Sequence, residues 1–168
     1  MVTSSLQNAG ERPDIEEVLA TVPDPEVPVL SVLELGVIRR SELIDNVVHI
    51  DMTPTYSGCP ALGRMQADIE VALQRAGYPQ VEVQIVFAPA WTTDWMSDEA
   101  KEKLKSYGIA PPNRTCGDCL LAAPQDVVPC PRCDDTRTEL RSQFGATACK
   151  ALYYCVACDE PFEYFKAF

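Results

Sequence analysis

Histidine, the side chain most often used for acid–base catalysis near neutral pH, occurs only once in the 168 residues, at position 49. The sequence also contains no glycine-rich phosphate loop, no Gly-x-Ser-x-Gly nucleophile motif and no further pair of carboxylates in a recognisable catalytic arrangement. These absences argue against a hydrolase or an oxidoreductase. We therefore expect a protein that is not itself an enzyme.

Basic residues and long apolar segments are also scarce. The chain has 14 Lys and Arg against 25 Asp and Glu, and its net charge is −11. The average field therefore repels nucleic-acid phosphates and anionic lipid surfaces. Residues 1–13 lack the apolar core of a secretion signal, and no apolar run reaches the roughly eighteen residues of a membrane span. We expect a cytoplasmic protein with neither nucleic acid nor membrane as a partner.

Cysteine, by contrast, is abundant, with eight in the chain. Without a secretion signal these residues favour metal ligands or redox-active thiols over a disulfide framework, because cytosolic reductants keep thiols free. Chance would place fewer than about one pair of cysteines three positions apart. Three such pairs occur: Cys116/Cys119, Cys130/Cys133 and Cys155/Cys158.

The last two pairs have the spacing of a four-cysteine zinc ribbon. The chain reads Cys-Pro-Arg-Cys, then about twenty spacer residues, then Cys-Val-Ala-Cys. Two such knuckles can present four thiolates tetrahedrally to Zn²⁺. A segment of about 50 residues buries too little surface to fold alone, so the metal would supply the missing stability. We predict a structural zinc held by Cys130, Cys133, Cys155 and Cys158; a chance pair of redox-active vicinal thiols is the alternative.

The remaining cysteines leave several interpretations open. Cys116 and Cys119 could compete for the same metal, contribute to a second site or remain free. Cys59 directly precedes a predicted helix, where exposed N–H groups and the helix dipole favour a thiolate and make it a better nucleophile or soft-metal ligand. A lone cysteine is more often a small buried side chain, and this applies to Cys59 and Cys149 alike.

The hydrophobic pattern predicts an α+β fold. After a flexible lead at 1–13, we predict a short helix that begins at Asp14, a hairpin of strands 37–44 and 47–53 turning at Asp45-Asn46, and a helix that starts at Pro60 and stops at Gly77. A third strand at 81–87 and a helix at 97–107 follow.

This order predicts a small open sheet with helices on one face, plus a C-terminal zinc-ribbon domain. The polar, proline-containing segment at 111–114 suggests the boundary between them. We therefore divide the chain into a flexible N-terminus at 1–13, an α+β domain at 14–112 and a zinc-ribbon domain at 113–168.

Particular motifs of the first domain resemble the iron–sulfur cluster assembly domain of SufT-like proteins. They fall at the spacing expected for that family and read Asp24-Pro-Glu-Val-Pro-Val-Leu30, Leu35-Gly-Val-Ile38 and Thr55-Tyr-Ser-Gly-Cys-Pro60. Further motifs along the chain from Asp14 onward resemble the PaaD family, accessory proteins of phenylacetate degradation. These are Pro89-Ala-Trp-Thr-Thr-Asp-Trp95, Tyr107-Gly-Ile-Ala-Pro-Pro112, Phe144-Gly-Ala-Thr-Ala-Cys-Lys-Ala-Leu-Tyr153 and Glu160-Pro-Phe-Glu-Tyr-Phe165. One departure from the pattern is Ala146, where serine is often found.

The resemblance implies an accessory or maturation factor of a phenylacetyl-CoA epoxidase, a multicomponent oxygenase. It would assist the assembly or insertion of an iron–sulfur cluster, with the reductase component as the expected client. Cys59, in the family's Thr-x-x-x-Cys-Pro motif that begins at Thr55, would be a transient ligand, and Asp24 and Glu26 would shape its site. Cys149 is a candidate extra ligand whose pKa Lys150 could lower; Cys116 and Cys119 stay candidates for a second metal.

The partners implied by the resemblance are the oxygenase or reductase components of the epoxidase system, and a homodimer is left open. The cofactors are a structural Zn²⁺ and a transient iron–sulfur cluster. The alternative is a non-catalytic structural or docking subunit, whose acidic surface and aromatic side chains bind an oxygenase component. The aromatic candidates are Trp91, Trp95, Tyr153, Tyr154 and Phe162.

Overall fold

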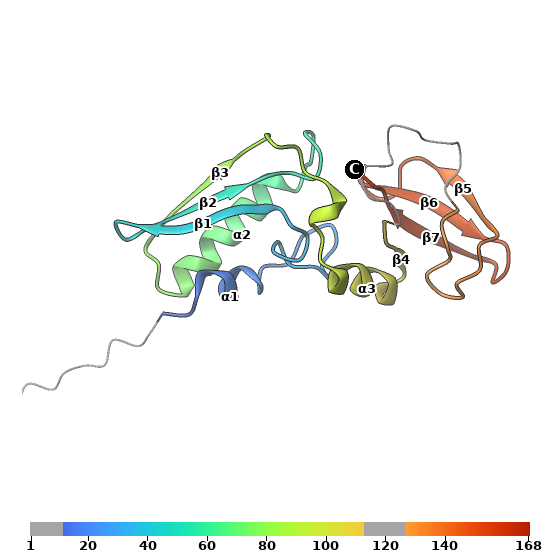
Figure 1. The fold of residues 1–168 in the computed structure, drawn as a ribbon, viewed down its shortest axis with the longest axis horizontal. Coiled ribbons are helices and arrows are strands. Elements are labelled where there is room, and N and C mark those ends of the chain that lie inside the picture. Colours follow the sequence, from blue (N-terminus) through green and yellow to red (C-terminus); the bar gives the residue numbers. More distant parts are fainter. Residues whose placement is uncertain (1–11, 113–126) are drawn as a thin grey trace, which may run out of the picture.

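A computed structural model describes residues 12–112 and 127–168 of the chain. Two small sheets with a set of short helices make up the fold (Figure 1). One sheet has the strand order β1-β2-β3 and the other the order β4-β7-β6-β5. The α+β class with a C-terminal ribbon, predicted from the sequence, is confirmed.

The first sheet is built around the predicted hairpin. Strands β1 (Ile38–Ile44) and β2 (Val47–Met52) are antiparallel, and β3 (Gln80–Ile85) pairs with β2 in parallel. The turn residues Asp45 and Asn46 have φ of 49° and 67°, the left-handed conformation that a two-residue hairpin turn requires. In β2, Val48, Ile50 and Met52 are fully buried while the residues between them are partly exposed, the alternation of a strand with one face on the core.

Helix α2 (Leu62–Arg75) packs on this sheet, and helix α1 (Ile15–Leu19) packs on α2. Helix α1 begins at Asp14, whose carboxylate accepts a hydrogen bond from the Glu16 N–H as an N-cap should. Helix α2 buries Met65, Ile69 and Leu73 and contacts β3. Its predicted start at Pro60 was two residues early, because Ala61 is the N-cap.

The segment between the sheets holds a short 3₁₀ turn, η1 (Thr93–Trp95), and helix α3 (Asp98–Tyr107). Ser97 caps α3 through a hydrogen bond from the Ala100 N–H, and Gly108 ends it with φ of 94°. In Figure 1, α3 runs beneath the gap between the two sheets and leads directly into the second. None of the helices in the described residues is long and apolar enough to span a membrane.

The ribbon sheet is formed by β4 (Ile109–Ala110), β5 (Thr138–Ser142), β6 (Lys150–Cys155) and β7 (Glu160–Phe165). Strands β5, β6 and β7 form an antiparallel meander, and β4 pairs in parallel with β7. The ribbon has a small core of its own, with Ala110, Val128, Ala151, Phe162 and Tyr164 packed among two of the cysteines.

The two parts share side chains at their junction. Cys149 and Phe165, both from the ribbon sequence, are buried in the core of the first domain. Phe165 and Phe168 each make an edge-on contact with Trp91, with ring centroids 6.1 Å apart in both pairs. Conversely, β4 lies before the boundary that we predict at 112 yet belongs to the ribbon sheet. The change of sheet therefore falls before β4, ahead of the division at 112, and the two cores interlock across that division.

Candidate metal centres

The four predicted cysteines come together in a cage at one end of the ribbon. Their Sγ atoms all lie within 4.8 Å of one another. The Sγ atoms of Cys130 and Cys158 are 3.7 Å apart, and those of Cys133 and Cys155 are 3.6 Å apart. A tetrahedral ion with metal–sulfur bonds of about 2.3 Å requires sulfur–sulfur separations of about 3.8 Å. The spacing of the donors therefore fits one tetrahedral thiolate-bound metal ion.

Two matching turns build this cage. The N–H of Asp134 donates to the carbonyl of Cys130, and the N–H of Asp159 donates to the carbonyl of Cys155, each at 3.0 Å. Both aspartates have a positive φ, of 58° and 63°. Each Cys-x-x-Cys segment thus closes on the residue that follows its second cysteine, which turns both sulfur atoms inward. Because each turn forms from residues that are close in the chain, the spacing of the cysteines was enough to predict the site.

The electrostatics of the cage favour a bound cation. Burial opposes ionisation of Cys155, but backbone N–H groups of Cys158 and Ala157 bring its pKa down to about 7. Burial and the neighbouring thiols raise the pKa of Cys158 to about 12. Thiols packed this closely cannot all ionise without a compensating positive charge, which a metal ion supplies.

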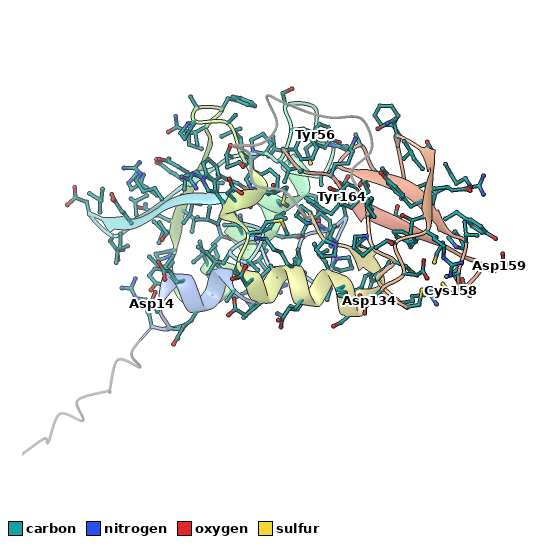
Figure 2. The ribbon with its side chains drawn as sticks, turned by 45° about the vertical axis from the view of Figure 1, so that its right-hand side comes forward. Asp14, Tyr56, Asp134, Cys158, Asp159 and Tyr164 are labelled. Atoms are coloured by element: carbon teal, nitrogen blue, oxygen red, sulfur yellow. The ribbon has the colours of Figure 1, made fainter. Side chains whose placement is uncertain are left out.

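A second group of candidate ligands lies at the other end of β6, where the ribbon meets the first domain. The Sγ atom of Cys149 is 3.8 Å from a carboxylate oxygen of Glu26, although 123 residues separate them. The thiol also lies 3.0 Å from the Thr147 hydroxyl. Figure 2 shows Tyr56 near this junction and Cys158 at the distant end of the ribbon. The two groups of sulfur atoms are therefore separate sites.

Cys59 faces the same region from the loop that precedes α2. It is half-buried and packs against the first-domain core that contains Cys149. Burial raises the pKa of Cys59 to about 11, and the negative charges of Glu26, Asp24 and Cys149 add to that effect. Burial also raises the pKa of the Tyr56 hydroxyl, and the charges of Cys59, Glu26 and Cys149 raise it further. These groups thus share one electrostatic environment.

These shifts correct two expectations about the thiols. The helix start was expected to favour the Cys59 thiolate, but only the Ala61 N–H lowers its pKa, and burial outweighs it. Lys150 does act on Cys149 in the expected direction, yet burial again dominates, and the pKa of Cys149 is raised. Burial thus disfavours the thiolate form of both side chains, which a bound cation would favour.

Two buried charged side chains act on the group formed by Cys59, Cys149 and Glu26. Asp24 is 5% exposed and accepts hydrogen bonds from the N–H groups of Glu26 and Val27, at 2.8 and 2.7 Å, so it shapes the turn that presents Glu26. Lys150 is 4% exposed and forms an ion pair of 2.7 Å with Glu163. Its charge opposes the rise that burial causes in the pKa values of Asp24 and Glu26.

Other predicted residues have different positions. Thr55 is buried in the loop before Cys59. Cys116 and Cys119 lie outside the described residues. Among the aromatic side chains considered for docking, Trp91 and Phe162 are 5% and 4% exposed, so both are core residues. Sequence reasoning did not identify Tyr56, Thr147 or Glu163; the first two stand close to Cys59 and Cys149 in the chain, whereas no local pattern marks Glu163.

The fold and the four-cysteine cage define a class of protein, a small α+β domain joined to a ribbon with a set of metal ligands. Comparison with family models agrees: residues 12–86 match the iron–sulfur cluster assembly protein family, and residues 115–166 match the PaaD zinc β-ribbon domain. A protein of Escherichia coli strain K12, named as a putative subunit of 1,2-phenylacetyl-CoA epoxidase, is 45% identical over 157 residues, which cover 92% of this chain and 93% of that protein. The chain belongs to the PaaD family.

Relatives of the first domain point the same way. A Porphyromonas gingivalis protein named "Fe-S protein maturation auxiliary factor" is 37% identical over 93 residues, or 54% of this chain and 88% of that protein. The crystal structure of a domain of unknown function, DUF59, from Bacillus anthracis is 31% identical with a TM-score of 0.50, covering 54% of this chain and 87% of that one. An accessory role built on an iron–sulfur assembly domain follows from these relationships.

Proposed function

We propose that this protein is a maturation factor that assists the assembly or insertion of an iron–sulfur cluster in a phenylacetyl-CoA epoxidase system, with the reductase component as the client. The observation that carries the proposal is the presence of two unlike thiol sites in one small fold. One is a closed cage of four cysteines, and the other is an open group around Cys59 and Glu26. The relatives named above supply the biochemical context.

The open site has the chemistry that a delivery site needs. Iron–sulfur clusters are held by thiolates, and a protein that passes a cluster on must release it. Cys59 is a partly exposed thiol with carboxylates nearby and a raised pKa, so a proton competes with iron for its sulfur. Such a ligand binds less tightly than one fixed in a preformed cage. The protein acts here by binding and transfer in the cytoplasm, without a catalytic residue of its own.

The cage has a structural role in this proposal, and its metal is zinc. Four thiolates at tetrahedral spacing saturate the coordination of Zn²⁺ and leave no open position for chemistry. Cys130, Cys133, Cys155 and Cys158 would hold the ion. The metal stabilises a ribbon whose own core is small.

Replacement of Cys59 by serine tests the role of the open site. Anaerobically purified wild-type protein should contain oxygen-sensitive iron below one equivalent or accept a cluster on reconstitution, and Cys59→Ser should lose this iron while it keeps its zinc. Gly63→Ala, close by on an exposed face of α2, is a matched control that should change neither metal. Epoxidase activity supported equally well by Cys59→Ser, with complex formation intact, would instead favour a docking subunit.

A further inference from the structure

We propose that the ribbon supplies a second thiol to the open site, so that Cys59 and Cys149 together bind an iron–sulfur cluster, with Glu26 beside them, across the junction of the two domains. The inference rests on the proposed function and deepens it, because it assigns a ligand from outside the assembly domain. It also gives the ribbon a direct part in handling the cluster.

The geometry of the junction carries this inference. Cys149 stands one residue before β6, and its sulfur contacts Glu26 of the first domain at 3.8 Å. Its backbone is fixed as well, since its carbonyl accepts a hydrogen bond of 3.0 Å from the Lys166 N–H. Cys59 packs against the same core from a third segment. The charges of Glu26 and Cys149 both act on Cys59, so three distant stretches of sequence bring two thiols and a carboxylate into one electrostatic environment.

The spacing of these groups suits a cluster better than a single ion. Within residues 12–112 and 127–168, one set of three or more candidate ligand atoms is close enough together to hold a single ion. That set is the zinc cage. Cys59, Cys149 and Glu26 are more widely spread than the cage sulfurs. A cluster carries its thiolates on different iron atoms and so accepts ligands farther apart. A junction cavity of about 400 Å³ is lined by Glu26, Lys150 and Glu163 among others; it lies beside Glu26, and neither cysteine lines it.

The charges at the junction also favour a bound group whose iron atoms carry positive charge. Asp24, Glu26 and Glu163 bring three carboxylates to this region, whereas Lys150 is the cation that acts on the first two and pairs with the third. When a formed cluster binds, each thiol releases its proton to solvent and its sulfur donates an electron pair to a cluster iron. No electron is transferred in this step, so it needs no oxidant or reductant.

Anaerobic reconstitution with ferric iron, sulfide and dithiothreitol as the reductant is the first test. Wild-type protein and Ala148→Ser, a neighbouring control, should bind the cluster, whereas Cys149→Ser and Cys59→Ser should each lose at least about tenfold in affinity, as expected when one of two thiolate ligands is removed. Cys149→Asp, which restores an anionic ligand, should recover part of the binding. Zinc content and tryptophan fluorescence should match the wild type in each variant that is compared.

A second test needs no cluster. Dibromobimane becomes strongly fluorescent when both of its bromomethyl groups have alkylated thiols, with loss of two bromide ions and two protons. In zinc-loaded protein with Cys116 and Cys119 replaced by serine, it should link Cys59 to Cys149, and mass spectrometry should identify that peptide pair. Either Cys59→Ser or Cys149→Ser should abolish the fluorescence.

The outcomes separate this inference from the function on which it rests. Full cluster binding by Cys149→Ser, with loss in Cys59→Ser, would overturn the two-thiol site and leave the maturation role in place. Failure of the wild-type protein to accept a cluster would overturn the maturation role itself. Absence of the Cys59–Cys149 link, while the reagent labels either thiol singly, would contradict the shared site whatever the reconstitution shows.

Discussion

Removal of the cage metal should weaken the first domain, although the cage lies at the far end of the ribbon. Strand β6 ends at the cage ligand Cys155 and begins beside Cys149, and β7 carries Phe165 into the first-domain core. If the ribbon loses its metal and unfolds, Phe165 leaves that core. The prediction therefore tests whether the two cores are coupled.

The expected magnitude comes from the contacts of Phe165. Its side chain is 1% exposed, and full burial of a phenylalanine contributes about 1.5–3 kcal/mol. Its edge-on contact with Trp91 adds roughly 0.5–1.5 kcal/mol. Loss of the metal should thus lower the free energy of unfolding of the first domain by about 2–4.5 kcal/mol.

Urea denaturation followed by tryptophan fluorescence measures this effect, because both tryptophans of the chain, Trp91 and Trp95, lie outside the ribbon. Zinc-loaded protein is compared with Cys133→Ser, which breaks the cage. Phe165→Ala should cost about 3–5 kcal/mol in the loaded protein and little in Cys133→Ser, since the strand is already released there. Identical fluorescence transitions with and without metal would refute the coupling.

Further predictions concern the local structure of the first domain. Gly36→Ala should cost about 2–6 kcal/mol in urea denaturation, because φ at this residue is 71° and a Cβ would lie 2.4 Å from the Trp95 carbonyl oxygen; Gly63→Ala, with no atom near its Cβ, should stabilise by about 0.5–1 kcal/mol. Glu34→Gln should cost about 1–2 kcal/mol at pH 7, after allowance for solvent screening, and progressively less below about pH 4.5. Although burial opposes it, the hydrogen bond from Lys103 holds the pKa of Glu34 below its ordinary value, so the stabilisation exists above the unfolded pKa and disappears as pH falls through the folded one.

The elements that the sequence predicted correctly are those fixed by short-range chemistry. The Asp45-Asn46 turn requires positive φ at both residues, and these side chains tolerate it. Asp14 and Ser97 cap helices through their own side chains, and the two Cys-x-x-Cys knuckles close within five residues. In each of these places the residues that determine the structure are neighbours in the chain.

The junction could not be predicted in this way, because tertiary packing creates it. The contact between Cys149 and Glu26 depends on how the ribbon sits against the first domain, and that placement depends on Phe165 entering a core built mostly from residues before 110. The raised pKa of Cys59 has the same origin. A position before a helix suggested a favoured thiolate, but the burial and the acidic neighbours that outweigh this effect come from other segments.

Metal analysis of anaerobically purified protein, before and after reconstitution, tests the central claim most directly. We expect about one tightly held zinc per chain, together with oxygen-sensitive iron that disappears in Cys59→Ser while the zinc remains. Protein that holds zinc but neither contains iron nor accepts a cluster would contradict an iron–sulfur maturation role.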